Sequence, residues 1–311
     1  MPPRKRRKLY KNISCNTELA STDDFLPMKE ESTEYNMNYS HRGYALIFHH
    51  FTFNPNLKHL RPREGSEFDL ERLQDVLKSL DFEVEVYEDQ TAAEIKQIIH
   101  MARNTDHSDC DCLIVVVLTH GKANSVVYAK DTAYCLQELW NPFMAKECPT
   151  LVGKPKIFFI QACRGKKVDS GLQVTDKMDV HGQQILECDA YTKPSGPDFL
   201  IVYSSVEGYG SFRNIRTGSW FIQSLCEKLE TFAPHMDLLT ITTRTTNRVA
   251  IDYNTGHDQD ETMNFKKQVP HVYSTLTKDI YFRPKDVDQQ EAKNNKKEDK
   301  HTETGSDLEE I

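Results

Sequence analysis

The chain has 311 residues, of which 38% are hydrophobic, and it carries a formal net charge of −8. This length is sufficient for one large α/β core or for two modest domains. No apolar run approaches the ~18 residues of a membrane-spanning helix, and the basic N-terminus lacks the apolar core of a signal peptide. The composition therefore predicts an intracellular protein that does not act at a membrane.

The eight cysteines are scattered along the chain. Several of them lie within apolar patterns, as is typical of reduced thiols inside the cell. His107, Cys110 and Cys112 are close enough together to suggest zinc. However, no second ligand pair has a matching spacing, and Cys112 begins an apolar strand. We therefore expect reduced thiols and no metal.

Strand and helix patterns alternate in the first half of the chain. The β-branched and apolar runs predict strands at 44–48, 82–87, 112–118 and 156–162. Helices are expected at 67–80, from Thr91 onward with Glu94 in the capping-box position, and at 134–146. Such alternation is typical of a mostly parallel sheet with helices on both faces.

The pattern breaks after residue 165. Residues 165–197 are rich in Gly, Asp, Lys and Ser, and loops of this length are usually functional or disordered. Order is expected to resume with a strand at 198–203, helices at 219–232 and 236–249, and a strand at 270–282. Residues 1–40 and the tail from Pro284 are polar, so we expect both to be disordered and the folded part to begin near Arg42.

A cysteine follows one of the predicted buried strands. Gln161, Ala162, Cys163, Arg164 and Gly165 come directly after the apolar run 156–160. A strand end, followed by a polar turn, leaves the sulfur open to solvent, as thiolate chemistry requires. A lone cysteine at such a place is more often an inert small apolar residue, so a second group is needed to support catalysis.

His120 and Gly121 supply that second group at the end of the strand 112–118. The carboxyl ends of parallel strands meet at one edge of the sheet, so the imidazole and the thiol are expected within reach of proton transfer. Gly121 allows close approach of a substrate, and its N–H could join that of Cys163 in an oxyanion hole.

These residues, with three further motifs, resemble the caspase family (peptidase C14-like) over roughly residues 39–283. The pentapeptide around Cys163 is a known caspase signature, with a histidine upstream of it. The matching motifs are Gln161-Ala162-Cys163-Arg164-Gly165, His120-Gly121, Arg63-Glu64-Gly65-Ser66, Ser211-Phe212-Arg213-Asn214 and Gly218-Ser219-Trp220-Phe221. The resemblance implies a caspase-type α/β sandwich, and the short N-terminal segment is similar to that of executioner (effector) members.

The resemblance also implies a division of the chain into processed parts. They are a short propeptide (1–40), a large-subunit region (41–165), a linker cleaved on activation (166–197), a small-subunit region (198–283) and a charged tail (284–311). Asp179 and Asp176 are the candidate activating cuts in the linker, and Asp23 or Asp24 is the candidate for removal of the propeptide.

The implied activity is that of a cysteine endopeptidase of apoptosis that cleaves strictly after aspartate and needs no cofactor. By this resemblance Cys163 is the nucleophile, His120 the acid and base, and Gly121 an oxyanion donor. The pocket for the aspartate side chain (P1) maps to Arg63, Gln161 and Arg213 with Ser211 nearby, and Phe212 and Trp220 are candidate apolar walls. A neutral P1 side chain would leave two arginine charges uncompensated, which favours a carboxylate.

Two departures from the family pattern concern selectivity. Gly210 stands where an aromatic residue often lines the P2 pocket, and residues 253–262 lack the aromatic cluster expected beside P4. P2 and P4 preferences therefore stay open.

The partners implied are protein substrates with aspartate at P1, an upstream initiator caspase and inhibitor-of-apoptosis proteins. The strand near residues 269–276 resembles the family's dimer interface, which implies a homodimer of processed heterodimers. We expect a cytoplasmic location, with nuclear import through the basic block between Arg4 and Lys8 as an alternative to a solvated tail.

Three other functions are alternatives to a protease that cleaves after aspartate. A cysteine protease that cleaves after basic residues would need acidic groups where this chain has arginines. A catalytically dead homologue that regulates an active caspase typically loses the nucleophile or the histidine, and both are present. Nucleic-acid binding through the basic block is disfavoured by the acidic overall charge.

Overall fold

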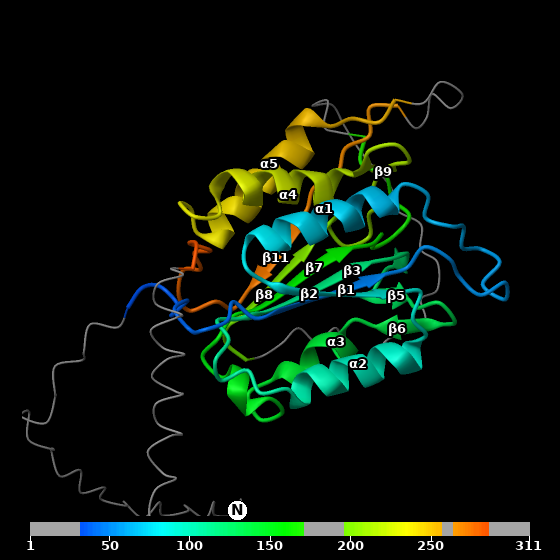
Figure 1. Ribbon diagram of the computed structural model, residues 1–311. Coiled ribbons are helices and arrows are strands. Elements are labelled where there is room, and N and C mark those ends of the chain that lie inside the picture. Colours follow the sequence, from blue (N-terminus) through cyan, green and yellow to red (C-terminus); the bar gives the residue numbers. More distant parts are fainter. Residues whose placement is uncertain (1–31, 171–195, 257–263, 286–311) are drawn as a thin grey trace, which may run out of the picture. The chain divides into compact units, whose positions relative to one another are not determined.

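A six-stranded sheet forms the centre of the fold, with the strand order β11-β8-β7-β3-β1-β2 (Figure 1). The computed structural model describes residues 32–170, 196–256 and 264–285. The strands are β1 (Tyr44–His49), β2 (Glu83–Glu88), β3 (Leu113–Leu118), β7 (Lys156–Gln161), β8 (Phe199–Tyr203) and β11 (His271–Ser274). All neighbouring strands are parallel except β11, which runs antiparallel to β8. The predicted mostly parallel α/β fold is confirmed.

Helices cover both faces of this sheet (Figure 1). The helices α1 (Ser66–Ser79), α4 (Trp220–Phe232) and α5 (Leu238–Asp252) lie on one face, and α2 (Ala92–Asn104) and α3 (Gln137–Trp140) lie on the other. Successive side chains of β3 point to opposite faces of the sheet, so each face has an apolar surface for its helices. Ile114 and Val116 pack with α1 and α4, whereas Val115 packs with α2. The predicted capping box of α2, between Thr91 and Glu94, is present.

The predicted helix at 134–146 is wrong over most of its length. Its first residues belong to β6 (Ala133–Cys135), which forms a three-stranded antiparallel sheet with β4 (Gly121–Lys122) and β5 (Val126–Tyr128). Only the short α3 and the 3-10 helix η1 (Asn141–Phe143) follow. Pro142 has no N–H to donate within a continuing helix, which limits both elements.

The predicted strand at 270–282 is also too long. Pairing stops at Ser274, and the chain then leaves the sheet and runs to α5, where the Ile280 carbonyl accepts a hydrogen bond from the Leu238 N–H. Three further short elements were not predicted from the sequence. They are the 3-10 helix η2 (Pro149–Leu151) and the hairpin of β9 (Arg213–Asn214) with β10 (Gly218–Ser219).

Order begins before Arg42, earlier than predicted. The Tyr35 side chain is buried, and its hydroxyl donates to Asp198 Oδ1 at 2.7 Å. Tyr35 therefore ties the N-terminal segment to the residue that precedes β8. This aromatic residue is surrounded by polar ones, so periodicity could not reveal its burial.

The thiols agree with the prediction at five positions and differ from it at one. Cys110, Cys112, Cys148, Cys163 and Cys226 are free. Cys135 is disulfide-bonded, so the prediction of reduced thiols throughout is wrong there. Cys135 lies half-buried at the end of β6, whereas Cys110, Cys112, Cys148 and Cys226 are buried. Within the described ranges no helix combines the length and apolarity that a membrane span needs.

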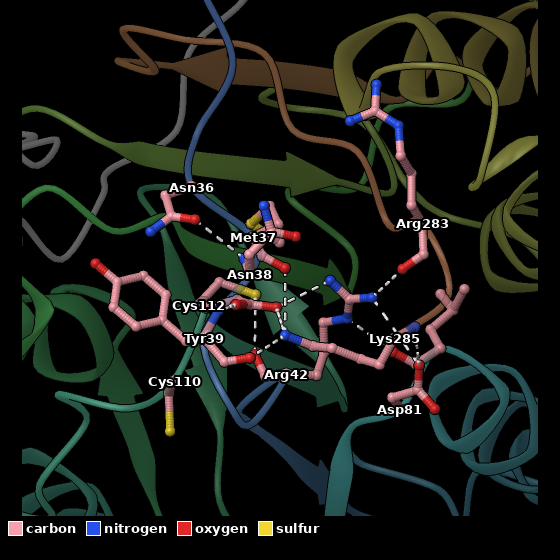
Figure 2. Close-up of polar contacts among 12 residues, drawn as sticks. Asn36, Met37, Asn38, Tyr39, Arg42, Asp81, Cys110, Cys112, Arg283 and Lys285 are labelled. Atoms are coloured by element: carbon pink, nitrogen blue, oxygen red, sulfur yellow. Dashed lines mark hydrogen bonds and ion pairs between the residues drawn. The ribbon is translucent and has the colours of Figure 1, made fainter. Parts of the chain in front are cut away.

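A buried ionic cluster joins the start of the folded region to its end (Figure 2). Arg42 is 2% exposed and donates to Asp111, which is fully buried, at 2.9 Å. Lys285 forms an ion pair with the same carboxylate and donates to the Tyr39 carbonyl at 2.7 Å. Arg42 also donates to the carbonyl of Arg283. Residues 39–42 and 283–285 are therefore held together around one carboxylate.

We predict that Asp111→Asn lowers the free energy of unfolding by about 3–5 kcal/mol, because it leaves the buried Arg42 and the half-buried Lys285 without their shared counter-charge. Urea denaturation measures this loss. Asp81→Asn is the matched control, since Asp81 is half-exposed and lies 4.0 Å from the same guanidinium. Its removal should cost less than about 1 kcal/mol. Equal losses in the two variants would contradict a dominant role for Asp111.

Candidate active site

Cys163 and His120 follow adjacent parallel strands. Leu118 of β3 pairs with Gln161 of β7, so both residues lie just beyond the last paired positions. A Cβ atom on Gly121 would lie 2.4 Å from the Cys163 carbonyl oxygen. The two strand ends are therefore in direct contact, and glycine is required at position 121. The structure brings the predicted thiol and imidazole to one edge of the sheet.

The loop after Cys163 differs from the solvent-exposed turn that the sequence suggested. Cys163 itself is half-buried, and its sulfur accepts a hydrogen bond from the Ser211 N–H at 3.4 Å. Arg164 is only 3% exposed, because its guanidinium lies 3.9 Å from the centre of the Tyr203 ring and pairs with Glu207. The segment that carries Cys163 is therefore fixed on both sides.

His120 is oriented by a main-chain carbonyl. Its Nε2 lies 2.8 Å from the carbonyl oxygen of Arg61. A carbonyl can only accept, so Nε2 carries the hydrogen and Nδ1 is left as the basic nitrogen. Burial lowers the pKa of His120 to about 4, an effect that the nearby charges of Arg63 and Arg213 reinforce. The imidazole is therefore neutral at pH 7, and Nδ1 is able to accept a hydrogen bond.

Two residues beyond β1, Phe53 and His50, support this imidazole, and neither was predicted from the sequence. The Phe53 ring packs against the His120 ring at 5.1 Å between centroids, and the His50 ring stacks on Phe53 at 6.4 Å. The His50 carbonyl accepts a hydrogen bond from Arg63 Nη1 at 3.2 Å. Because β1 lies next to β3, the position of these residues after a strand end was a usable signal.

Arg63, Gln161 and Arg213 come together beside Cys163. Arg63 is 1% exposed, and its Nε and Nη2 have no hydrogen-bond partner. Gln161 is buried and donates to Ser211 Oγ at 2.9 Å. Arg213 is held by the Glu64 carbonyl, which accepts from its Nε at 2.8 Å. Unpaired buried donors of this kind match a carboxylate ligand.

Burial disfavours the charged form of the arginine in this pocket. Desolvation, together with the neighbouring Arg213, lowers the pKa of Arg63 to about 9. Buried Asp69 offsets part of the positive charge, and it was missed by the sequence analysis. Its Oδ1 accepts from the Ser219 N–H at 2.8 Å, which links the pocket to the start of α4. The arrangement therefore favours an anionic ligand.

An aromatic wall lies next to this pocket. The Trp220 ring packs between Phe212, at 4.8 Å, and Tyr253, at 5.2 Å. The Phe212 N–H donates to Gln268 Oε1 at 2.6 Å, which fixes the wall to the segment before β11. Phe212 and Trp220 were expected here, whereas Tyr253 and Gln268 were not.

The candidate cleavage sites Asp23, Asp24, Asp176 and Asp179, and the basic block between Arg4 and Lys8, lie outside the described residues. The first part of the linker is described. There Asp169 pairs with Lys267 and Lys167 pairs with Tyr209, each through an isolated bridge.

Comparisons with known proteins agree with this geometry. The Caspase domain family matches residues 42–281. Caspase-1 of Spodoptera frugiperda is 42% identical over 260 residues, which cover 84% of this chain and 85% of the relative. Caspase drICE of Drosophila melanogaster is 42% identical over 258 residues, covering 82% and 74% of the two chains. The crystal structure of the Spodoptera frugiperda Caspase-1 matches with a TM-score of 0.74 at 41% identity, over 84% of this chain and 98% of that one.

The chain belongs to the caspase family. It is therefore a cysteine-type peptidase, a hydrolase of a family that acts in apoptosis on protein substrates.

We predict that His50 makes the folding stability depend on pH. His50 is fully buried, and burial lowers its pKa to about 4. Between about pH 4 and pH 6.5 the unfolded chain binds more protons than the folded one, so stability falls as the pH falls through this window. About 2 kcal/mol of the loss between pH 7.5 and pH 5 should come from this group. Urea denaturation of His50→Asn should show a smaller loss by that amount, and an unchanged pH dependence would contradict the assignment.

Proposed function

We propose that this protein is an effector caspase that cleaves protein substrates strictly after aspartate. The observation that carries the proposal is the buried guanidinium of Arg63, which has two unpartnered nitrogens. It lies close enough to Arg213 and Cys163 for their charges to act on it. A P1 carboxylate would accept the unused hydrogen bonds and neutralise the pocket, with Gln161 and Ser211 beside it.

In the proposed mechanism Cys163 Sγ attacks the main-chain carbonyl carbon of the P1 aspartate, and His120 Nδ1 takes the thiol proton. The N–H groups of Gly121 and Cys163 stabilise the oxyanion. Two features of the site support the role of Gly121. The Tyr128 N–H bonds to the His120 carbonyl, so the alternation of the antiparallel ladder turns the Gly121 N–H away from β5. The close contact of Gly121 with Cys163 brings the two donors together.

The second half of the reaction uses the same imidazole. The tetrahedral intermediate collapses to a thioester, and His120 returns its proton to the leaving amine. His120 then takes a proton from water as the water attacks the thioester, the C–S bond breaks, and His120 returns that proton to Cys163 Sγ. Phe212 and Trp220 provide the apolar surface along which the residues before P1 lie.

The proposal includes activation of a zymogen by an initiator caspase, with cuts after Asp179 or Asp176 in the linker and after Asp23 or Asp24 near the N-terminus. The processed heterodimers pair as a homodimer through β11, which is the outermost strand at its end of the sheet. Inhibitor-of-apoptosis proteins complete the proposed partners. We propose a cytoplasmic location, with nuclear entry dependent on the block between Arg4 and Lys8.

We predict that Arg213→Met lowers kcat/KM for a fluorogenic Asp-Glu-Val-Asp peptide by at least about 100-fold, because the P1 carboxylate loses one of its two charged donors. Arg216→Met is the matched control, since Arg216 is exposed in the same hairpin. It should change kcat/KM by less than about twofold. Equal activity of the Arg213 variant and the control would exclude Arg213 from the pocket.

A further inference from the structure

A cavity of about 210 Å³ lies between the β1–β2 edge of the sheet and α2. It is lined by Tyr44, Glu85, Tyr87, Ile98, Met101 and His107, among others. Tyr44 is the first residue of β1, whereas the catalytic groups follow the last residues of the strands, so this cavity is separate from the active site. Figure 1 shows α2 lying along this face of the sheet.

The size of the cavity suits one side chain. Pockets for drug-sized ligands usually hold about 300–1,000 Å³, and a cavity of about 150 Å³ is sufficient for benzene. A volume of 210 Å³ lies between these cases. The cavity can therefore take a planar group on a short stem, but not a larger ligand as a whole.

The polar lining of the cavity can accept hydrogen bonds from a ligand. His107 is fully buried, and its Nε2 lies 2.8 Å from the Ala102 carbonyl oxygen. The imidazole therefore forms part of the cavity wall but offers no accessible nitrogen to a ligand, because its unpartnered Nδ1 is buried as well. The exposed Glu85 carboxylate accepts from the Tyr87 hydroxyl and adds negative charge. The Tyr44 ring, edge-on to His107 at 5.9 Å, adds an aromatic surface.

The neighbouring surface is an acidic strand edge. β2 pairs with β1 on one side, and no strand in the described parts of the chain pairs with its other side. Glu83, Glu85 and Glu88 are exposed along it. Charged residues on an edge strand prevent pairing with like strands. That role does not explain the cavity, whereas a basic segment would be complementary both to the Glu85 carboxylate in the cavity lining and to the acidic edge.

We propose that the cavity binds an arginine side chain from an extended segment of a partner protein, which adds to the free edge of β2. The guanidinium would donate to the Glu85 carboxylate, with its plane against the tyrosine rings. The main chain of the segment would hydrogen-bond to β2 in the manner of strand addition. A protein substrate with such a segment would be held at a second site in addition to its cleavage site.

Fluorescence anisotropy with the full chain tests this proposal. The probe is a labelled Thr-Val-Arg-Val-Thr peptide, and the matched peptide has Gln in place of Arg. The Arg peptide should bind at least tenfold more tightly than the Gln peptide, and Glu85→Gln should weaken its binding at least fivefold. Glu83→Gln makes the same charge change on the same strand but outside the cavity lining, so it should alter the affinity less than twofold.

Three results would overturn the proposal. Equal affinities for the Arg and Gln peptides would exclude recognition of the guanidinium. Equal losses in the Glu83 and Glu85 variants would show general attraction to an acidic edge instead of a cavity. Binding of N-acetylarginine amide as tightly as the peptide would exclude strand addition. Melting temperatures that match the parent protein's verify that both variants are folded.

Discussion

The burial of the Arg63 guanidinium is the constraint on which the site depends. A charged group with unpartnered nitrogens in the interior costs stability, and the lowered pKa of Arg63 is the mark of that cost. The fold offsets part of it with the His50 carbonyl and the charge of Asp69. The remaining unused donors are fixed before a substrate arrives. A carboxylate therefore meets a pocket that needs little rearrangement, which is the condition for strong discrimination.

The same contacts connect the anion pocket to the catalytic pair. His50 bonds to Arg63 through its carbonyl and stacks on Phe53, which in turn packs against His120. Gln161 ends β7 two residues before Cys163 and bonds to Ser211, whose N–H reaches the Cys163 sulfur. The ends of β3 and β7 thus position His120 and Cys163, and Phe53 and Arg63 lie in the segment between β1 and α1. A rigid parallel sheet sets the spacing of the strand ends.

Much of this arrangement was predictable from the sequence, because it follows from local patterns. The continuous apolar runs of β3 and β7 indicate buried parallel strands, and the residues that follow them meet at one edge. Those rules were sufficient to bring His120 and Cys163 together. The arginines of the pocket were found only through the resemblance to a family, since a buried arginine has the same local sequence signal as an exposed one.

The predictions that were wrong concern segments whose structure depends on contacts with residues distant in the sequence. Residues 133–135 pair with β5 instead of beginning a helix, and a helical period could not exclude this. Arg164 is polar in sequence but buried under Glu207 and against Tyr203, which no local rule predicts. Tyr35 is ordered because Asp198 and Thr277, far along the chain, bond to its hydroxyl. In all three segments the structure is determined by tertiary contacts and not by the local sequence.

The most direct test of the account compares hydrolysis of an Asp-Glu-Val-Asp peptide with that of the matched peptide ending in Asn, after the chain has been cut in its linker. The account predicts turnover of the Asp peptide, turnover at least about 100-fold lower for the Asn peptide, and none of either with Cys163→Ala. Equal hydrolysis of the two peptides would contradict the charged pocket. Absence of turnover in the cut wild-type chain would contradict the catalytic assignment and favour a regulatory homologue.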